Sequence, residues 1–107
     1  MALMRAASVE DMRKPGKLLK VKGGGRTYVL VNSGGALYCI DGICMKDGCQ
    51  LGEGKLAGHT LKCPWHGAEF DVRTGFILRN VPPQYGIATN LRTYRVLVQE
   101  GEVFIDI

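Results

Sequence analysis

The segment from Cys63 to Gly67, with the sequence Cys-Pro-Trp-His-Gly, sets a thiol and an imidazole in a Cys-x-x-His arrangement inside a glycine-flanked loop. A second thiol, Cys44, lies upstream in another glycine-containing segment. Thiolate and imidazole groups bind iron and zinc, and the ligands of such a site must converge on one point. The spacing therefore predicts a metal centre, and it requires a fold that brings two distant loops together.

Length and composition favour one small globular domain that covers residues 1–107. The chain has 107 residues, of which 46% are apolar, enough for a modest core. No apolar run approaches the roughly 18 residues of a membrane helix, and the first residues contain no signal-peptide core. We therefore expect a cytoplasmic protein with no membrane partner. In that compartment the four cysteines are better used for metal binding than for disulfides.

The net charge of +4 includes a group of basic residues near the N-terminus. Their positions are Arg13, Lys14, Lys17, Lys20 and Lys22. No aromatic residues are interleaved with them, so a solvated face is favoured over a nucleic-acid site. An acidic redox partner is compatible with this charge.

Glycine-rich turns separate short alternating or β-branched runs along the whole chain, a pattern typical of an all-β protein. The predicted strands are Lys17–Lys22, Thr27–Asn32, Ala36–Ile40, Leu61–Cys63, Phe70–Val72, Leu91–Gln99 and Val103–Ile107. One helical turn is predicted from Ser8 to Arg13, with Ser8 as its N-cap and Asp11 near its amino end.

Two glycine-rich loops carry the candidate ligands. Loop one runs from Cys44 to Gly54 and loop two begins at Cys63, with a short hairpin around His59 between them. Glycines at positions 48, 52, 54 and 67 permit the close backbone approach that a metal centre requires. We expect His59 to lie exposed in the hairpin turn without binding metal. Cys39 alternates with an apolar residue in a strand, which predicts core packing.

Together these segments resemble a Rieske-type 2Fe-2S ferredoxin, of the small soluble kind found in oxygenase systems and in archaeal relatives. The matching positions cover nearly the whole chain and are Tyr38, Ile40, Asp41, Gly48, Leu51, the run Cys63–Gly75 and the pair Pro82-Pro83. The resemblance implies an all-β Rieske-type fold, with a small antiparallel β-sandwich base. A smaller cluster-binding β subdomain, about residues 42–80, would contain the two ligand loops.

The resemblance also implies a function. A Rieske-type ferredoxin is an electron carrier and not an enzyme, and it passes one electron at a time from a reductase to an oxygenase or another terminal acceptor. Cys44 and Cys63 would bind the inner iron of the 2Fe-2S cluster, and His66 would bind the outer iron. The chain shows no nucleophile arrangement and no phosphate-binding loop, so we expect no small-molecule substrate.

The sequence departs from this family at the fourth ligand. A Rieske cluster is held by two cysteines and two histidines, yet Lys46 occupies the position of the first histidine. Lys46 must lose a proton before it can coordinate, against a reference pKa of about 10.4. Cys49 is chemically better suited and would complete a Cys3His set with Cys44, Cys63 and His66.

Three interpretations of the site remain open. The favoured one is a 2Fe-2S cluster with altered or incomplete ligation. The second is a single zinc or iron ion in Cys3His coordination. The third is a metal-free site on a retained scaffold. In the last two cases the chain would act as a structural or interaction subunit, and the lysine would be a natural or an engineered ligand change.

Further departures concern the redox potential. High-potential members of the family join cysteines at the positions of Cys49 and Trp65, and they place hydroxyl donors at the positions of Ala68 and Phe70. This chain lacks the second cysteine and both hydroxyl groups. Fewer hydrogen bonds to sulfur stabilise the reduced state less, so we expect a potential toward the low end of the roughly −150 to +300 mV Rieske range.

Overall fold

The computed structural model describes residues 3–43, 50–64, 67–80 and 89–107. Its strands are β1 (Leu3–Ser8), β2 (Leu18–Gly23), β3 (Arg26–Ser33), β4 (Ala36–Asp41), β5 (Lys55–Ala57), β6 (Thr60–Lys62), β7 (Glu69–Asp71), β8 (Ile77–Arg79), β9 (Thr93–Gln99) and β10 (Glu102–Asp106). Two short 3-10 helices are η1 (Glu10–Met12) and η2 (Leu51–Glu53). No helix in these ranges is long and apolar enough to cross a membrane.

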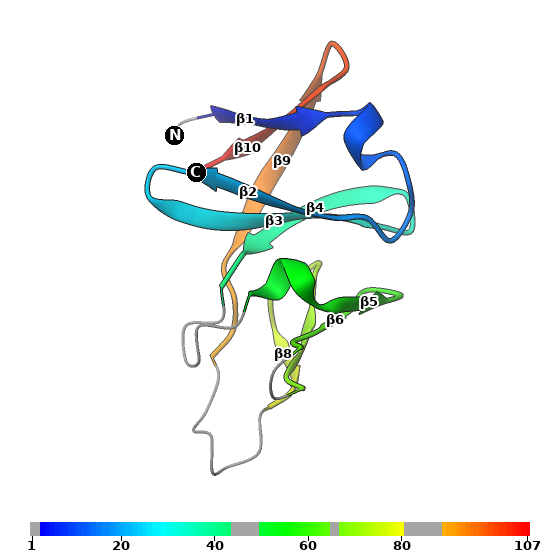
Figure 1. Cartoon of the computed structure of the whole chain (residues 1–107), viewed down its shortest axis with the longest axis vertical. Helices are drawn as coiled ribbons and strands as arrows, with labels where there is room; N and C mark the ends of the chain where they lie inside the picture. Colours follow the sequence, from blue (N-terminus) through cyan, green and yellow to red (C-terminus); the bar gives the residue numbers. More distant parts are fainter. Residues whose placement is uncertain (1–2, 44–49, 65–66, 81–88) are drawn as a thin grey trace.

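Six strands form the base of the molecule, in the order β1-β10-β9-β4-β3-β2. β9 joins the two halves of this sheet through the pairs Cys39–Tyr94 and Ile40–Thr93. Figure 1 shows β1 and β10 lying across β2 and β3. A first core, which includes Leu30 and Val103, fills the space between the halves. This arrangement is the β-sandwich base that the family resemblance implied.

Four short strands form a second, smaller sheet in the order β5-β6-β7-β8. A tight hairpin joins β5 to β6, and Gly58 in its turn has a φ of +60°, which glycine adopts without strain. All the pairs are antiparallel. The small sheet lies below the base in Figure 1, next to β3 and β4.

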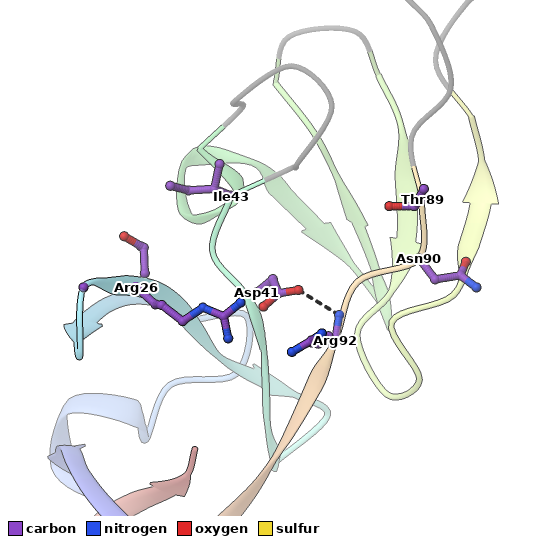
Figure 2. Close-up of a pocket in the computed structure, with 8 residues that line it drawn as sticks. Arg26, Asp41, Ile43, Thr89, Asn90 and Arg92 are labelled. Carbon is purple, nitrogen blue, oxygen red and sulfur yellow. Dashed lines mark hydrogen bonds between the residues drawn. The ribbon is translucent and has the colours of Figure 1, made fainter.

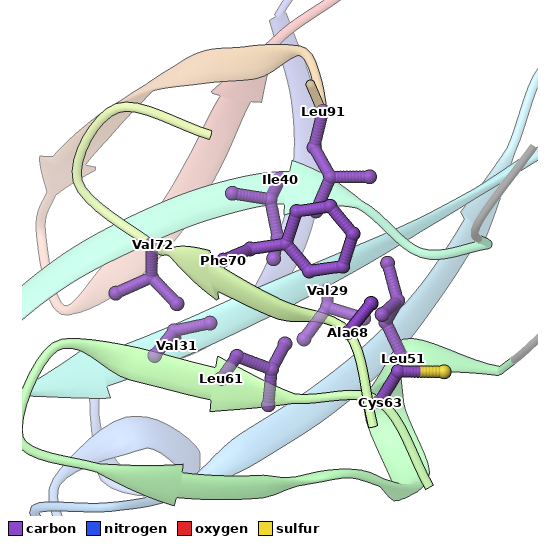
Figure 3. Packing of buried hydrophobic residues seen from close by; sticks show 10 residues of the cluster. All are labelled: Val29, Val31, Ile40, Leu51, Leu61, Cys63, Ala68, Phe70, Val72 and Leu91. Carbon is purple, nitrogen blue, oxygen red and sulfur yellow. The ribbon is translucent and has the colours of Figure 1, made fainter. Parts of the chain in front are cut away.

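A second core joins the small sheet to the base. β3 supplies residues to both cores, because Tyr28 and Leu30 point into the first core whereas Val29 and Val31 point into the second. The small sheet contributes Leu61 and Phe70, both fully buried. Figure 3 shows these side chains packed between the two sheets. Each face of β3 is therefore covered, which explains its nearly continuous apolar sequence.

Most predicted strands are confirmed, and the differences are local. β1 and β8 were not predicted, and β5 was predicted only as part of the short hairpin around His59. Their sequences show no clear alternation, and their strand state depends on pairing with β10, β7 and β6. The predicted helical turn is present as η1, but its N-cap is Val9 and not Ser8. Ser8 and Asp11 instead exchange hydrogen bonds between the backbone N–H of each and the side chain of the other, both at 3.2 Å.

Candidate metal centre

Loop two is closed at its stem by strand pairing and one backbone hydrogen bond. Lys62 pairs with Glu69 across β6 and β7, and the Cys63 N–H donates to the Ala68 carbonyl at 2.7 Å. Gly67 has a φ of +76°, a conformation that favours glycine. Cys63 is 1% exposed and lies at one edge of the second core, as Figure 3 shows. The fold thus holds Cys63 at a fixed position at the edge of the apolar core.

Loop one is closed at its base in a similar way. Ile43 forms an isolated β-bridge with Gln50, and the Leu51 N–H donates to the Gly42 carbonyl at 2.9 Å. The chain on either side of residues 44–49 is therefore held together. Leu51, which follows, is fully buried in the second core.

The two loops lie side by side at their stems. A Cβ atom on Gly54, at the end of loop one, would lie 2.4 Å from the carbonyl oxygen of Lys62. Only glycine permits this approach, which packs the exit of loop one against the stem of loop two. This contact is consistent with the prediction that the fold brings the two loops together.

Cys63 is the one predicted ligand within the described ranges. Cys44, Lys46, Cys49 and His66 lie outside the described residues, as do Trp65 and Pro82-Pro83. In the part of the chain that the structure describes, no three His, Cys, Asp or Glu side chains gather into a metal-binding cluster. A surface cavity of about 250 Å³ opens beside Cys63 and is lined by Glu53, Gly54, Lys55, Lys62, Cys63 and Pro64.

Residues 2–95 match the family model described as the Rieske [2Fe-2S] domain. The chain belongs to this family. The ferredoxin component of the naphthalene 1,2-dioxygenase system of Pseudomonas putida is 30% identical over 104 residues, which span 97% of this chain and 94% of that protein. Among solved structures, the Sphingomonas yanoikuyae B1 ferredoxin has a TM-score of 0.85 and 25% identity, over 99% of each chain.

A further solved structure is the complex of reduced oxygenase and oxidized ferredoxin in carbazole 1,9a-dioxygenase. It gives a TM-score of 0.82 with 28% identity, over 96% of this chain and 91% of the matched chain. The predicted family and fold class are therefore confirmed. The cofactor of this Rieske domain is a 2Fe-2S cluster.

The described part of loop two fits such a cluster. A Rieske domain requires a buried cysteine at the start of its second loop and glycine where the backbone turns beside the cluster. Cys63 and Gly67 meet these two requirements. Ala68 and Phe70 are both fully buried in the same core as Cys63 and carry no hydroxyl group. The protein on the core side of Cys63 is therefore apolar.

His59 is placed differently from our prediction of an exposed turn residue. Its ring Nδ1 lies 2.5 Å from the Ser33 Oγ, and its ring meets that of Tyr38 edge-to-face at a centroid distance of 6.4 Å. Ser33 is 2% exposed, and its hydroxyl also donates to the Gly58 carbonyl at 2.7 Å. The hairpin turn of the small sheet is therefore docked on the end of β3. The exposure was mispredicted because the partner, Ser33, is distant in sequence.

Asp41, at the end of β4, fastens the entrance of loop one to the start of β9. Its carboxylate accepts hydrogen bonds from the Arg92 N–H at 2.9 Å and from the Tyr94 hydroxyl at 2.6 Å. Burial, together with this hydrogen bond, raises the pKa of Tyr94 to about 12. Figure 2 shows Asp41 and Arg92 on one side of a pocket of about 390 Å³ that also includes Ile43.

The remaining cysteine in the described ranges, Cys39, is structural. It is 1% exposed and belongs to the first core, between the halves of the base. Burial, reinforced by the charge of Asp41, raises the pKa of the Cys39 thiol to about 12. Because only the thiolate binds metal well, this environment keeps Cys39 an apolar packing residue, as its alternation in the strand predicted.

Proposed function

We propose that this Rieske domain carries one electron at a time from a reductase to a terminal oxygenase. Its relatives are named as ferredoxin components of dioxygenase systems, and the carbazole 1,9a-dioxygenase structure contains a ferredoxin with its oxygenase. The observation that carries the proposal is the match over nearly the full length of both chains. In this role the protein supplies position and environment, and it catalyses no reaction of its own.

We assign the ligands by the family arrangement. Cys44 and Cys63 would hold the inner iron, and His66 would hold the outer iron. When bound, the cluster supplies a one-electron redox couple. The burial of Cys63, the closed stem of each loop and the close approach of Gly54 to the Lys62 carbonyl support this assignment, because they hold the stems of the two loops next to each other.

The fourth ligand is the open chemical question of the site. Lys46 stands in the position of the missing histidine, and Cys49 is the other candidate in loop one. Thiolate coordination by Cys49 in a Cys3His set would favour a single zinc or iron ion and a scaffold function. Coordination by a deprotonated Lys46, or by no side chain at that position, would retain the cluster and the carrier function.

We treat residues 1–107 as one domain, with the cluster-binding subdomain at about 42–80. The shared second core supports this division, since the small sheet packs directly on β3 and β4. We place the protein in the cytoplasm, where thiols stay reduced and available for iron. Cell fractionation with an antibody against the chain would test that placement.

Metal and acid-labile sulfide analysis of anaerobically purified protein tests the proposed function. We expect about two irons and two sulfides per chain, with an electron-spin-resonance signal after reduction. One zinc or iron without sulfide would overturn the carrier function. The variants K46A and C49S then identify the fourth ligand, because only the residue that coordinates should change the metal content. K46H serves as the control that restores the family's ligand set.

A further inference from the structure

One row of side chains crosses the whole small sheet next to loop two. The strand register places Lys55 opposite Lys62, Lys62 opposite Glu69, and Glu69 opposite Arg79. The neighbouring row, Leu56-Leu61-Phe70-Ile77, faces the second core. Because side chains alternate between the faces of a sheet, Lys55, Lys62 and Glu69 face outward. The register shifts between Glu69 and Phe70, so alternation does not place Arg79 in β8; Arg79 is exposed, as are Lys55 and Lys62.

This charged row has an excess of positive charge. Glu69 is paired with Arg79 at 4.0 Å, and the nearby Glu53 is paired with Lys20 at 3.0 Å. Within the described residues, no carboxylate forms an ion pair with Lys55 or Lys62. Two like charges directly opposite each other destabilise a strand pair. Glu69, which lies opposite Lys62, offsets part of this repulsion, but Lys55 has no carboxylate opposite it within the described residues.

The charged row lies immediately beside the cluster-binding loop. Lys62 precedes Cys63, and the Lys62 Cε is 3.5 Å from the position of a Cβ on Gly67. Lys55 and Lys62 also line the 250 Å³ cavity that reaches Cys63. Leu78, next to Arg79 in β8, is 56% exposed and adds an apolar contact of the kind found at protein interfaces.

We infer that the charged row is a docking surface for an electron-transfer protein that presents carboxylates around its own redox centre. The inference rests on the proposed function. Carboxylates of the partner would pair with Lys55 and Lys62 and relieve the repulsion between them. Positive charge at this place raises the rate of encounter with an acidic face and orients that face toward loop two.

A labelled acidic peptide tests the surface without relying on the cluster. Fluorescein-labelled decaglutamate is titrated with wild-type protein, with the variant K55E/K62E, and with the control K14E/K22E, at low and high salt. The control makes the same change in net charge at exposed lysines of the base. We expect K55E/K62E to weaken binding about tenfold at low salt, with the control close to wild type. Equal weakening in both variants, or none in K55E/K62E, would overturn the inference.

Oxidation kinetics of the reduced protein provide the second measurement. Anionic ferricyanide should oxidise wild type and control faster at low salt than at high salt, whereas cationic hexaamminecobalt(III) should show the opposite dependence. K55E/K62E should reverse both trends, and unchanged trends in that variant would contradict the docking surface. Iron and sulfide analysis distinguishes failure of the proposed function from failure of the docking surface. Protein that lacks a cluster but still binds the peptide refutes only the proposed function. Protein that carries a cluster but shows no charge effect refutes only the docking surface.

Discussion

Replacing Ser33 with alanine should weaken the attachment of the small sheet to the base. The Ser33 hydroxyl lies at the end of β3, where it contacts both the Gly58 carbonyl and the His59 ring. Each neutral hydrogen bond contributes about 0.5–1.5 kcal/mol net, so the loss of two predicts about 1–3 kcal/mol. His59 is only half-buried, and water can replace part of its lost bond. We therefore expect about 1–2 kcal/mol for S33A.

Urea unfolding of the cluster-bearing protein, followed by far-ultraviolet circular dichroism and by cluster absorbance, measures this effect. The hairpin that S33A would loosen leads through β6 into Cys63, so cluster absorbance should be lost at a lower urea concentration than in wild type. S8A is the matched control, because Ser8 makes a side-chain hydrogen bond at an exposed site far in sequence from the small sheet. A decrease below about 0.5 kcal/mol in S33A, or an equally early loss of cluster absorbance in S8A, would refute the role of this contact.

Three other changes test separate parts of the structure. Phe70 is fully buried between the sheets, so F70A should lower the free energy of unfolding by about 3–5 kcal/mol and F70L by roughly 1.5 kcal/mol or less. Similar denaturant midpoints for the two variants would argue against that packing. A68S should raise the midpoint potential, by roughly 60 mV if the new hydroxyl favours the reduced state tenfold, and voltammetry that shows no rise would mean that the hydroxyl does not reach sulfur. The hydrogen bonds from Arg73 lower the pKa of Asp71, so the ionised pair stabilises the fold at pH values above the ordinary aspartate range, and this contribution is lost as the pH falls through the lowered pKa. R73A should therefore make stability less dependent on pH below about pH 4. Urea titrations that show the same loss of stability at acid pH in R73A and wild type would contradict this.

The sequence was sufficient for the fold class, because the strands follow from local patterns. Val29 and Val31 alternate with Tyr28 and Leu30, which indicates a strand directly, and Cys63 with His66 forms a compact motif. The sequence was not sufficient for β1. Its Leu, Met and Ala residues have no preference for strand, and they pair with β10 only because the first core brings the two ends of the chain together.

The charged row and the docking of His59 were also beyond the sequence, for a related reason. Lys55 and Lys62 meet through strand register, and that register depends on which residues the second core buries. A shift of one residue would turn Lys62 inward and expose Leu61. The contact between His59 and Ser33 likewise exists only after the small sheet has packed on β3. Each feature is a consequence of tertiary packing that no local pattern encodes.

β6 connects these features, because its three residues separate the docked hairpin turn from the first residue of loop two. At one end of β6, His59 contacts Ser33 and attaches the small sheet to the base. At the other end, Lys62 is followed by Cys63. The two ends should nevertheless respond differently to mutation. S33A removes two neutral hydrogen bonds, so it should change stability and leave the salt dependence of electron transfer unaltered. K55E/K62E should reverse that salt dependence, and because it sets a glutamate opposite Glu69 it should also lower stability. A changed salt dependence in S33A would show that the attachment of the small sheet and its charge are not independent.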